Sequence, residues 1–236
     1  MDPVQSAGPE RQVDMGRLKK MVAIRLVLFL IVMGLIFFWP AGTFRYWQAW
    51  TYIAILFIPI LGVVAYFLRK DPELLERRMR TREKEPAQKN LMIISSFVFL
   101  FVFLLPGFDR RFGWSSVPVF VIIIADIIIL AGYGLFVLAM KENRYASRVI
   151  EVEDKQKVIT SGPYAVVRHP MYLAAMPIYI LSPLALGSYW AVLPAILLIF
   201  VLVARIKNEE KVMIKELPGY REYLQRVRFR LIPRIW

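Results

Sequence analysis

The only histidine in the chain, His169, stands in a short polar run between two strongly apolar stretches. The run covers residues 161–172 and reads SGPYAVVRHPMY, which places an Arg, two Pro and two Tyr around the imidazole. Ser-Gly-Pro predicts a turn, and a residue before proline is biased away from helical geometry. Pro170 suits the first position of a helix. His169 is therefore expected at a helix N-terminus, where backbone N–H groups and the helix dipole favour a bound anion.

A purely structural role accounts for the same run equally well. In that interpretation His169 caps the helix, and Tyr164 and Tyr172 are aromatic residues of the membrane interface. The residues alone leave both interpretations open.

A second candidate pair follows the last apolar stretch. Arg205 and Glu209 are four residues apart and so share one face of a helix. An exposed pair of this kind stabilises a helix by only about 0.3–0.5 kcal/mol, and Arg before Glu is the less favourable order. A ligand for one or both side chains is the sharper explanation.

Metal chemistry has little support in the composition. The chain has no Cys and a single His, which excludes disulfides, thiolate nucleophiles and Cys-type zinc sites, so no metal site is expected. Asp126 lies alone within an apolar segment, away from the polar run. It is interpreted as a helix-packing residue and is not a site candidate.

These candidates must be positioned by membrane helices. Hydrophobic residues make up 58% of the 236 residues, against about 45–50% in soluble domains, and the mean hydropathy is +0.52. Six apolar segments approach the length of about 20 residues that crosses a bilayer. The prediction is an all-α, polytopic membrane helical bundle of about six spans, over residues 21–39, 50–68, 91–108, 117–140, 171–186 and 189–204.

The basic residues predict the orientation of this bundle. Alternate connections hold 28 of the 31 Lys and Arg, including both terminal segments. The positive-inside rule then places both termini in the cytoplasm. The net charge of +13 is thereby explained by topology, and no nucleic-acid partner is expected.

The chain divides into three parts on this reading. Residues 1–20 are expected to be a mobile N-terminal tail. Residues 21–140 form a four-span membrane region with a cytoplasmic loop at 69–90, in which 71–79 predict an amphipathic helix lying on the membrane surface, with Asp71 as its cap. Residues 141–236 form the catalytic region: a loop, a helical hairpin and a cytoplasmic tail.

Several motifs together carry a family resemblance. They are Gly162-Pro163-Tyr164, Arg168-His169-Pro170-Met171-Tyr172, Arg205 with Glu209-Glu210, and Gly219-Tyr220 with Tyr223. From about residue 141 to the end, the chain resembles the isoprenylcysteine carboxyl methyltransferase family in its prokaryotic form. Phospholipid methyltransferases share a similar C-terminal design.

The resemblance implies an integral membrane methyltransferase that takes S-adenosylmethionine into a cytoplasmic pocket. It implies that Arg205 binds the substrate and acts in catalysis. The residues that match the family's cofactor-binding positions are Gln156, Lys157, Val158, Ile159, Tyr164, His169, Pro170, Met171, Tyr172 and Glu209.

The expected acceptor is the carboxylate of an isoprenylcysteine-type lipid or prenylated partner that enters from the bilayer, with membrane lipids around it. A carboxylate has a reference pKa of about 3.5–4, so it is already ionised at neutral pH and needs no general base. Arg205 can hold it by paired hydrogen bonds. The expected location is a prokaryotic plasma membrane, with the endoplasmic reticulum as the alternative.

Three other functions remain open from the sequence. The first is N-methylation of a phospholipid amine with the same cofactor. The second is a non-catalytic membrane scaffold that keeps the fold. The third, an NADPH-dependent reductase, is weaker because no glycine-rich dinucleotide fingerprint is present. The oligomeric state is left open as well.

Overall fold

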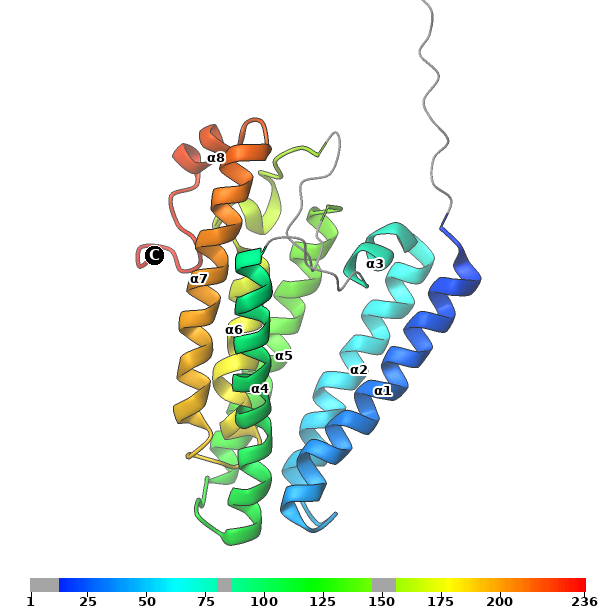
Figure 1. Cartoon of the computed structure of the whole chain (residues 1–236), viewed down its shortest axis with the longest axis vertical. Coiled ribbons are helices and arrows are strands. Elements are labelled where there is room, and N and C mark those ends of the chain that lie inside the picture. Colours follow the sequence, from blue (N-terminus) through cyan, green and yellow to red (C-terminus); the bar gives the residue numbers. More distant parts are fainter. Residues whose placement is uncertain (1–12, 80–85, 146–155) are drawn as a thin grey trace, which may run out of the picture.

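The computed structural model describes residues 13–79, 86–145 and 156–236. Within these ranges the chain is all-helical and has no strand, which confirms the predicted fold class (Figure 1). The elements in chain order are α1 (Met15–Ala41), α2 (Trp47–Lys70), α3 (Pro72–Arg78), α4 (Pro86–Phe112), α5 (Val119–Glu142), the 3-10 helix η1 (Gly162–Ala165), α6 (Pro170–Ala185), α7 (Val192–Glu216) and α8 (Tyr220–Arg226).

Four of these helices are long and apolar enough to cross a bilayer: α1, α2, α5 and the Asn90–Phe112 part of α4. Large apolar side chains such as Leu28, Phe97 and Ile127 are more than half exposed on their outer faces. An apolar exterior of this length is what a lipid environment requires, so the chain is an integral membrane protein.

The last two predicted spans form the α6–α7 hairpin. α6 has 16 residues, about 24 Å at 1.5 Å per residue, which is shorter than the hydrocarbon core of about 30 Å. α7 starts at Val192, within the predicted span 189–204, and continues beyond that span to Glu216. Its second half is charged and projects beyond the apolar segment, and this extension carries Arg205 and Glu209.

The first helix begins earlier than expected. The side chain of Asp14 accepts a hydrogen bond from the backbone N–H of Arg17 at 3.0 Å, which caps α1 at its N-terminus. Residues 15–20 are therefore helical, and the prediction of a mobile tail over residues 1–20 is wrong for this part. Residues 1–12 lie outside the described residues.

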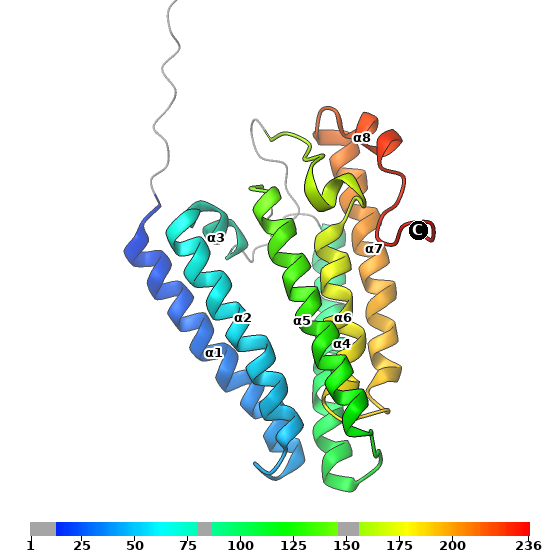
Figure 2. The ribbon, with the colours of Figure 1, turned by 180° about the vertical axis from the view of Figure 1, so that it is seen from behind.

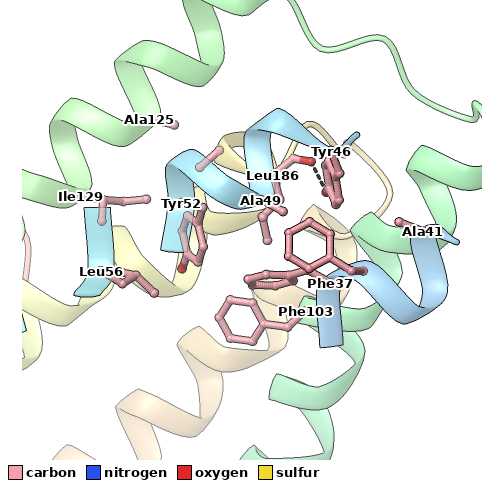
Figure 3. Packing of buried hydrophobic residues seen from close by; sticks show 12 residues of the cluster. Phe37, Ala41, Tyr46, Ala49, Tyr52, Leu56, Phe103, Ala125, Ile129 and Leu186 are labelled. Carbon is pink, nitrogen blue, oxygen red and sulfur yellow. Dashed lines mark hydrogen bonds between the residues drawn. The ribbon is translucent and has the colours of Figure 1, made fainter. Parts of the chain in front are cut away.

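An aromatic core joins the two halves of the bundle at the end opposite α3 and α8. Phe37, Tyr52 and Phe103 are buried there with ring centroids about 6 Å apart (Figure 3). The Tyr46 hydroxyl donates to the Leu186 carbonyl at 2.5 Å, which ties the start of α2 to the end of α6. Helices α4, α5, α6 and α7 pack side by side, with α5 along α6 and α4 against α7.

The short helix α3 closes the opposite end between α1, α2 and α5. Leu74 and Leu75 are 1% and 3% exposed and pack in one cluster with Leu18, Phe67 and Met140. The apolar face of the helix is therefore covered by protein, where the sequence predicted contact with the membrane surface. Asp71 caps it as predicted, accepting from the backbone N–H of Leu74 at 3.1 Å.

The polar elements gather at this same end of the molecule. In both views the start of α1, α3, η1 and α8 lie together at one end of the long helices (Figures 1 and 2). The α1–α2 hairpin leans away from the other helices here, whereas at the far end it packs against them. The arrangement brings the candidate site residues between positions 156 and 209 to one end of the bundle.

Candidate functional site

A cavity of about 410 Å³ lies at this polar end, between η1, α6, α7 and the ends of α3, α4 and α5. Its volume falls in the range of about 300–1,000 Å³ that is usual for small-molecule sites. All eleven residues predicted for the site line it: Gln156, Lys157, Val158, Ile159, Tyr164, His169, Pro170, Met171, Tyr172, Arg205 and Glu209. The structure thus brings them together, while their individual roles stay predictions.

The turn before α6 depends on a glycine. Gly162 has φ +54°, in the left-handed region, and a Cβ there would lie 2.6 Å from Cγ of Glu142. Ser161 Oγ donates to Glu142 Oε2 at 2.7 Å, so the end of α5 holds the turn. This contact sets where η1 and Tyr164 enter the cavity wall.

Tyr164 is fixed from both sides. Its hydroxyl accepts from Asn143 Nδ2 at 3.3 Å, and its carbonyl accepts from the Tyr223 hydroxyl at 2.7 Å. Burial raises the pKa of Tyr164 to about 12, partly offset by the hydrogen bond from Asn143. The phenol is therefore neutral at physiological pH and serves as a polar edge and an aromatic face.

His169 is at the N-cap position of α6, but its side chain makes no capping hydrogen bond. The ring is buried, and its Nε2–H donates to Glu210 Oε1 at 3.3 Å. Its backbone N–H donates to the Arg230 carbonyl at 2.9 Å. The predicted helix N-terminus is confirmed, whereas the side chain points to a buried carboxylate and not to its own helix.

Glu210 is the centre of a buried ionic cluster. Its Oε1 lies 2.8 Å from Arg168 Nε, and its Oε2 accepts from Arg230 Nε at 2.8 Å. Burial by itself raises the pKa of this carboxyl, but the hydrogen bonds from His169 and Arg230 and the charge of Arg168 outweigh it and lower the pKa. Glu210 thus joins α7, the turn before α6 and the C-terminal segment around an ionised group.

The neighbouring Glu209 faces the cavity. Successive residues of a helix are rotated by about 100°, so two adjacent carboxylates point in different directions. Glu209 Oε2 accepts from the Tyr172 hydroxyl at 2.6 Å, and that hydroxyl accepts from Arg205 Nε at 2.8 Å. Tyr172 therefore bridges the two residues that the sequence placed on one helix face.

Sequence reasoning missed part of the cavity wall. Arg78 reaches it from the end of α3, with its guanidinium 5.3 Å from the ring centroid of Phe136. The local sequence does not indicate this contact, because residues 71–79 predict a helix on the membrane surface. Tyr220 and Tyr223 also line the wall, and the family motif that contains them was the available signal.

The cavity has an apolar arm that runs between the long helices. Its lining includes Phe99 of α4, Tyr179 of α6 and Leu198 and Leu202 of α7. These side chains belong to segments that are apolar enough for the membrane interior. The cavity therefore joins a charged end to an apolar one.

A comparison with protein families adds to this geometry. The family model described as phospholipid methyltransferase matches residues 120–218. The match spans 99 of the 236 residues, from α5 to just past the end of α7. The match confirms the resemblance to membrane methyltransferases of the isoprenylcysteine carboxyl methyltransferase-like group, and the matched region contains all eleven predicted site residues. A search of curated proteins finds no match to the chain.

Proposed function

We propose that this membrane methyltransferase uses S-adenosylmethionine to methylate the carboxylate of a lipidic acceptor, of the isoprenylcysteine type. The observation that carries the proposal is the charge of the cavity wall. Among the described lining residues, Arg78, Lys157, Arg168 and Arg205 face a single carboxylate, Glu209. The charged side chains of the described lining are therefore four cations and one anion, and one of the cations, Arg168, also pairs with Glu210. A surplus of cations favours an anionic acceptor over a protonated amine.

The polar and aromatic side chains that line the cavity suit the cofactor. S-adenosylmethionine carries an ammonium, a carboxylate, an aromatic base and an electrophilic methyl group on a sulfonium. Glu209 would hold the ammonium, and Lys157 with the polar groups at the start of α6 would hold the carboxylate. The aromatic faces of Tyr164, Tyr220 and Tyr223 suit a cation.

Positioning is the main task of the protein groups. An ionised carboxylate is already a nucleophile at neutral pH, so orientation at close range replaces a general base. Arg205 would hold it by paired hydrogen bonds, and Tyr172 fixes the Arg205 guanidinium through the 2.8 Å contact. The apolar arm beside Leu198 and Leu202 would take the lipid tail from the bilayer and keep water out.

The polar end is proposed to face the cytoplasm, where the cofactor is found, in the plasma membrane of a prokaryote. Both chain termini would then be cytoplasmic, as the distribution of Lys and Arg predicts.

Product chemistry tests the acceptor. Purified protein is incubated with methyl-labelled S-adenosylmethionine and either a prenylated cysteine carboxylate or the matching carboxamide. The proposal expects label only from the carboxylate, released as methanol in alkali because the product is an ester. Alkali-stable label on phosphatidylethanolamine would instead support N-methylation, which the description of the matched family keeps as the second candidate.

A further inference from the structure

A second depression, separate from the cavity, opens between α2 and α5. It has a volume of about 360 Å³, and its lining includes Pro59, Gly62, Tyr66, Tyr133, Gly134 and Lys141. No described residue lines both this depression and the cavity described above. Among the described residues of its lining, Lys141 is the only charged one, and the others are apolar or aromatic.

Two glycines, one on each of the helices that border the groove, leave open space in it. A Cβ built at Gly62 or at Gly134 would meet nothing within 4 Å. Small residues on membrane helices usually permit close helix contact. Here the space beside both glycines is open. Because neither residue has a side chain to fill it, a channel remains at the outer surface of the bundle.

The groove ends at an ammonium group. Lys141 lies in the last turn of α5, and its Nζ is 4.6 Å from the ring centroid of Tyr66. No carboxylate in the described ranges lies within ion-pair distance of it. Two acids at this end of the bundle are engaged elsewhere: Glu142 accepts from Ser161 at 2.7 Å, and Asp71 pairs with Arg144 at 2.9 Å.

We infer that this groove binds one phospholipid with a net negative headgroup. An acyl chain lies between Gly62 and Gly134, and the phosphate contacts Lys141 at the polar end. Charge complementarity selects this occupant, because a phospholipid carries its anionic group where the groove presents its cation. The inference is independent of methyl transfer, since the two sites share no residue.

Thermal unfolding of delipidated protein in detergent, with native mass spectrometry of retained lipid, tests the inference. The probes are phosphatidylglycerol and phosphatidylcholine with identical acyl chains. Phosphatidylglycerol is expected to raise Tm with concentration, because a ligand of the folded state stabilises it. Lys141→Ala is expected to weaken this binding by about fivefold or more, and Gly134→Leu, which fills the channel, by at least as much.

The chain offers a matched control. Gly34 of α1 also has nothing within 4 Å of a built Cβ and lies outside the groove, so Gly34→Leu should keep the lipid response. If Gly134→Leu does not fold, the lipid responses of Lys141→Arg and Lys141→Ala are compared. Only Lys141→Arg keeps the cation, so only it should keep the preference for phosphatidylglycerol. Equal responses of all variants, or equal responses to both lipids, would overturn the inference. Loss of a dimer in Gly134→Leu would identify a second copy as the occupant and overturn it as well.

Discussion

Replacing Glu210 by Gln removes the charge at the centre of the buried cluster and keeps the shape of the side chain. Arg168 would then be a buried cation without its counter-ion, since its side chain is only 7% exposed. Breaking a buried ion pair in this way costs about 3–5 kcal/mol. The Arg230 side chain is 32% exposed, so the loss of that contact adds about 1 kcal/mol or less.

The neighbouring glutamate supplies the control. Glu209→Gln makes the same chemical change one position earlier on the same helix, but at a side chain that faces the cavity. The structure predicts a loss of about 3 kcal/mol or more in the free energy of unfolding for Glu210→Gln and a much smaller loss for Glu209→Gln. Ligand binding should show the reverse order: in the folded fraction of each variant, Glu209→Gln should weaken binding more than Glu210→Gln does.

The assay is denaturant unfolding in mild detergent, followed by circular dichroism at several pH values. The folded pKa of Glu210 is lowered, so its stabilisation is present above its unfolded pKa of about 4.3 and is lost as pH falls through the folded value. The wild type should therefore lose stability below about pH 4.5, and Glu210→Gln should lose less over the same interval. Equal stability of the two Gln variants at neutral pH would refute the reasoning about this cluster.

Three further substitutions test separate contacts. Tyr172→Phe should lower the methylation rate by about 10–100-fold and also cost stability, because it removes hydrogen bonds to two charged groups, each worth about 1.5–3 kcal/mol; normal kinetics would contradict the bridge to Glu209. Gly132→Ala should destabilise the α5–α6 contact by about 1–3 kcal/mol in thermal unfolding, because its Cβ would lie 2.7 Å from the Ala174 carbonyl oxygen; an unchanged Tm would count against this packing. Leu75→Ala should cost about 2–5 kcal/mol in the same assay, as expected for a fully buried leucine and not for one on a lipid surface.

The local features of the site were predictable because they follow from neighbouring residues. Pro170 after His169 predicts the start of α6, and a spacing of four predicts that Arg205 and Glu209 share a face. These positions are confirmed as parts of one cavity wall. The resemblance supplied the remaining lining residues, which no spacing argument would have selected.

The long-range contacts were not predictable from local pattern. Glu210 meets Arg230 and His169 from 20 and 41 residues away, and a sequence read in short windows contains no sign of those pairs. Arg78 was likewise hidden, since an amphipathic helix has the same pattern whether lipid or protein covers its apolar face. The end of the last apolar segment at residue 204 marks a change in polarity, and α7 continues through it because its charged residues are still good helix formers.

Calorimetric titration of S-adenosylhomocysteine and S-adenosylmethionine into detergent-purified protein, beside Glu209→Ala, tests the central claim most directly. The account predicts saturable one-site binding of both ligands to the wild type and its loss in Glu209→Ala, with circular dichroism showing that the variant is folded. Absence of binding by the folded wild type would contradict the assignment of this cavity to the methyl donor.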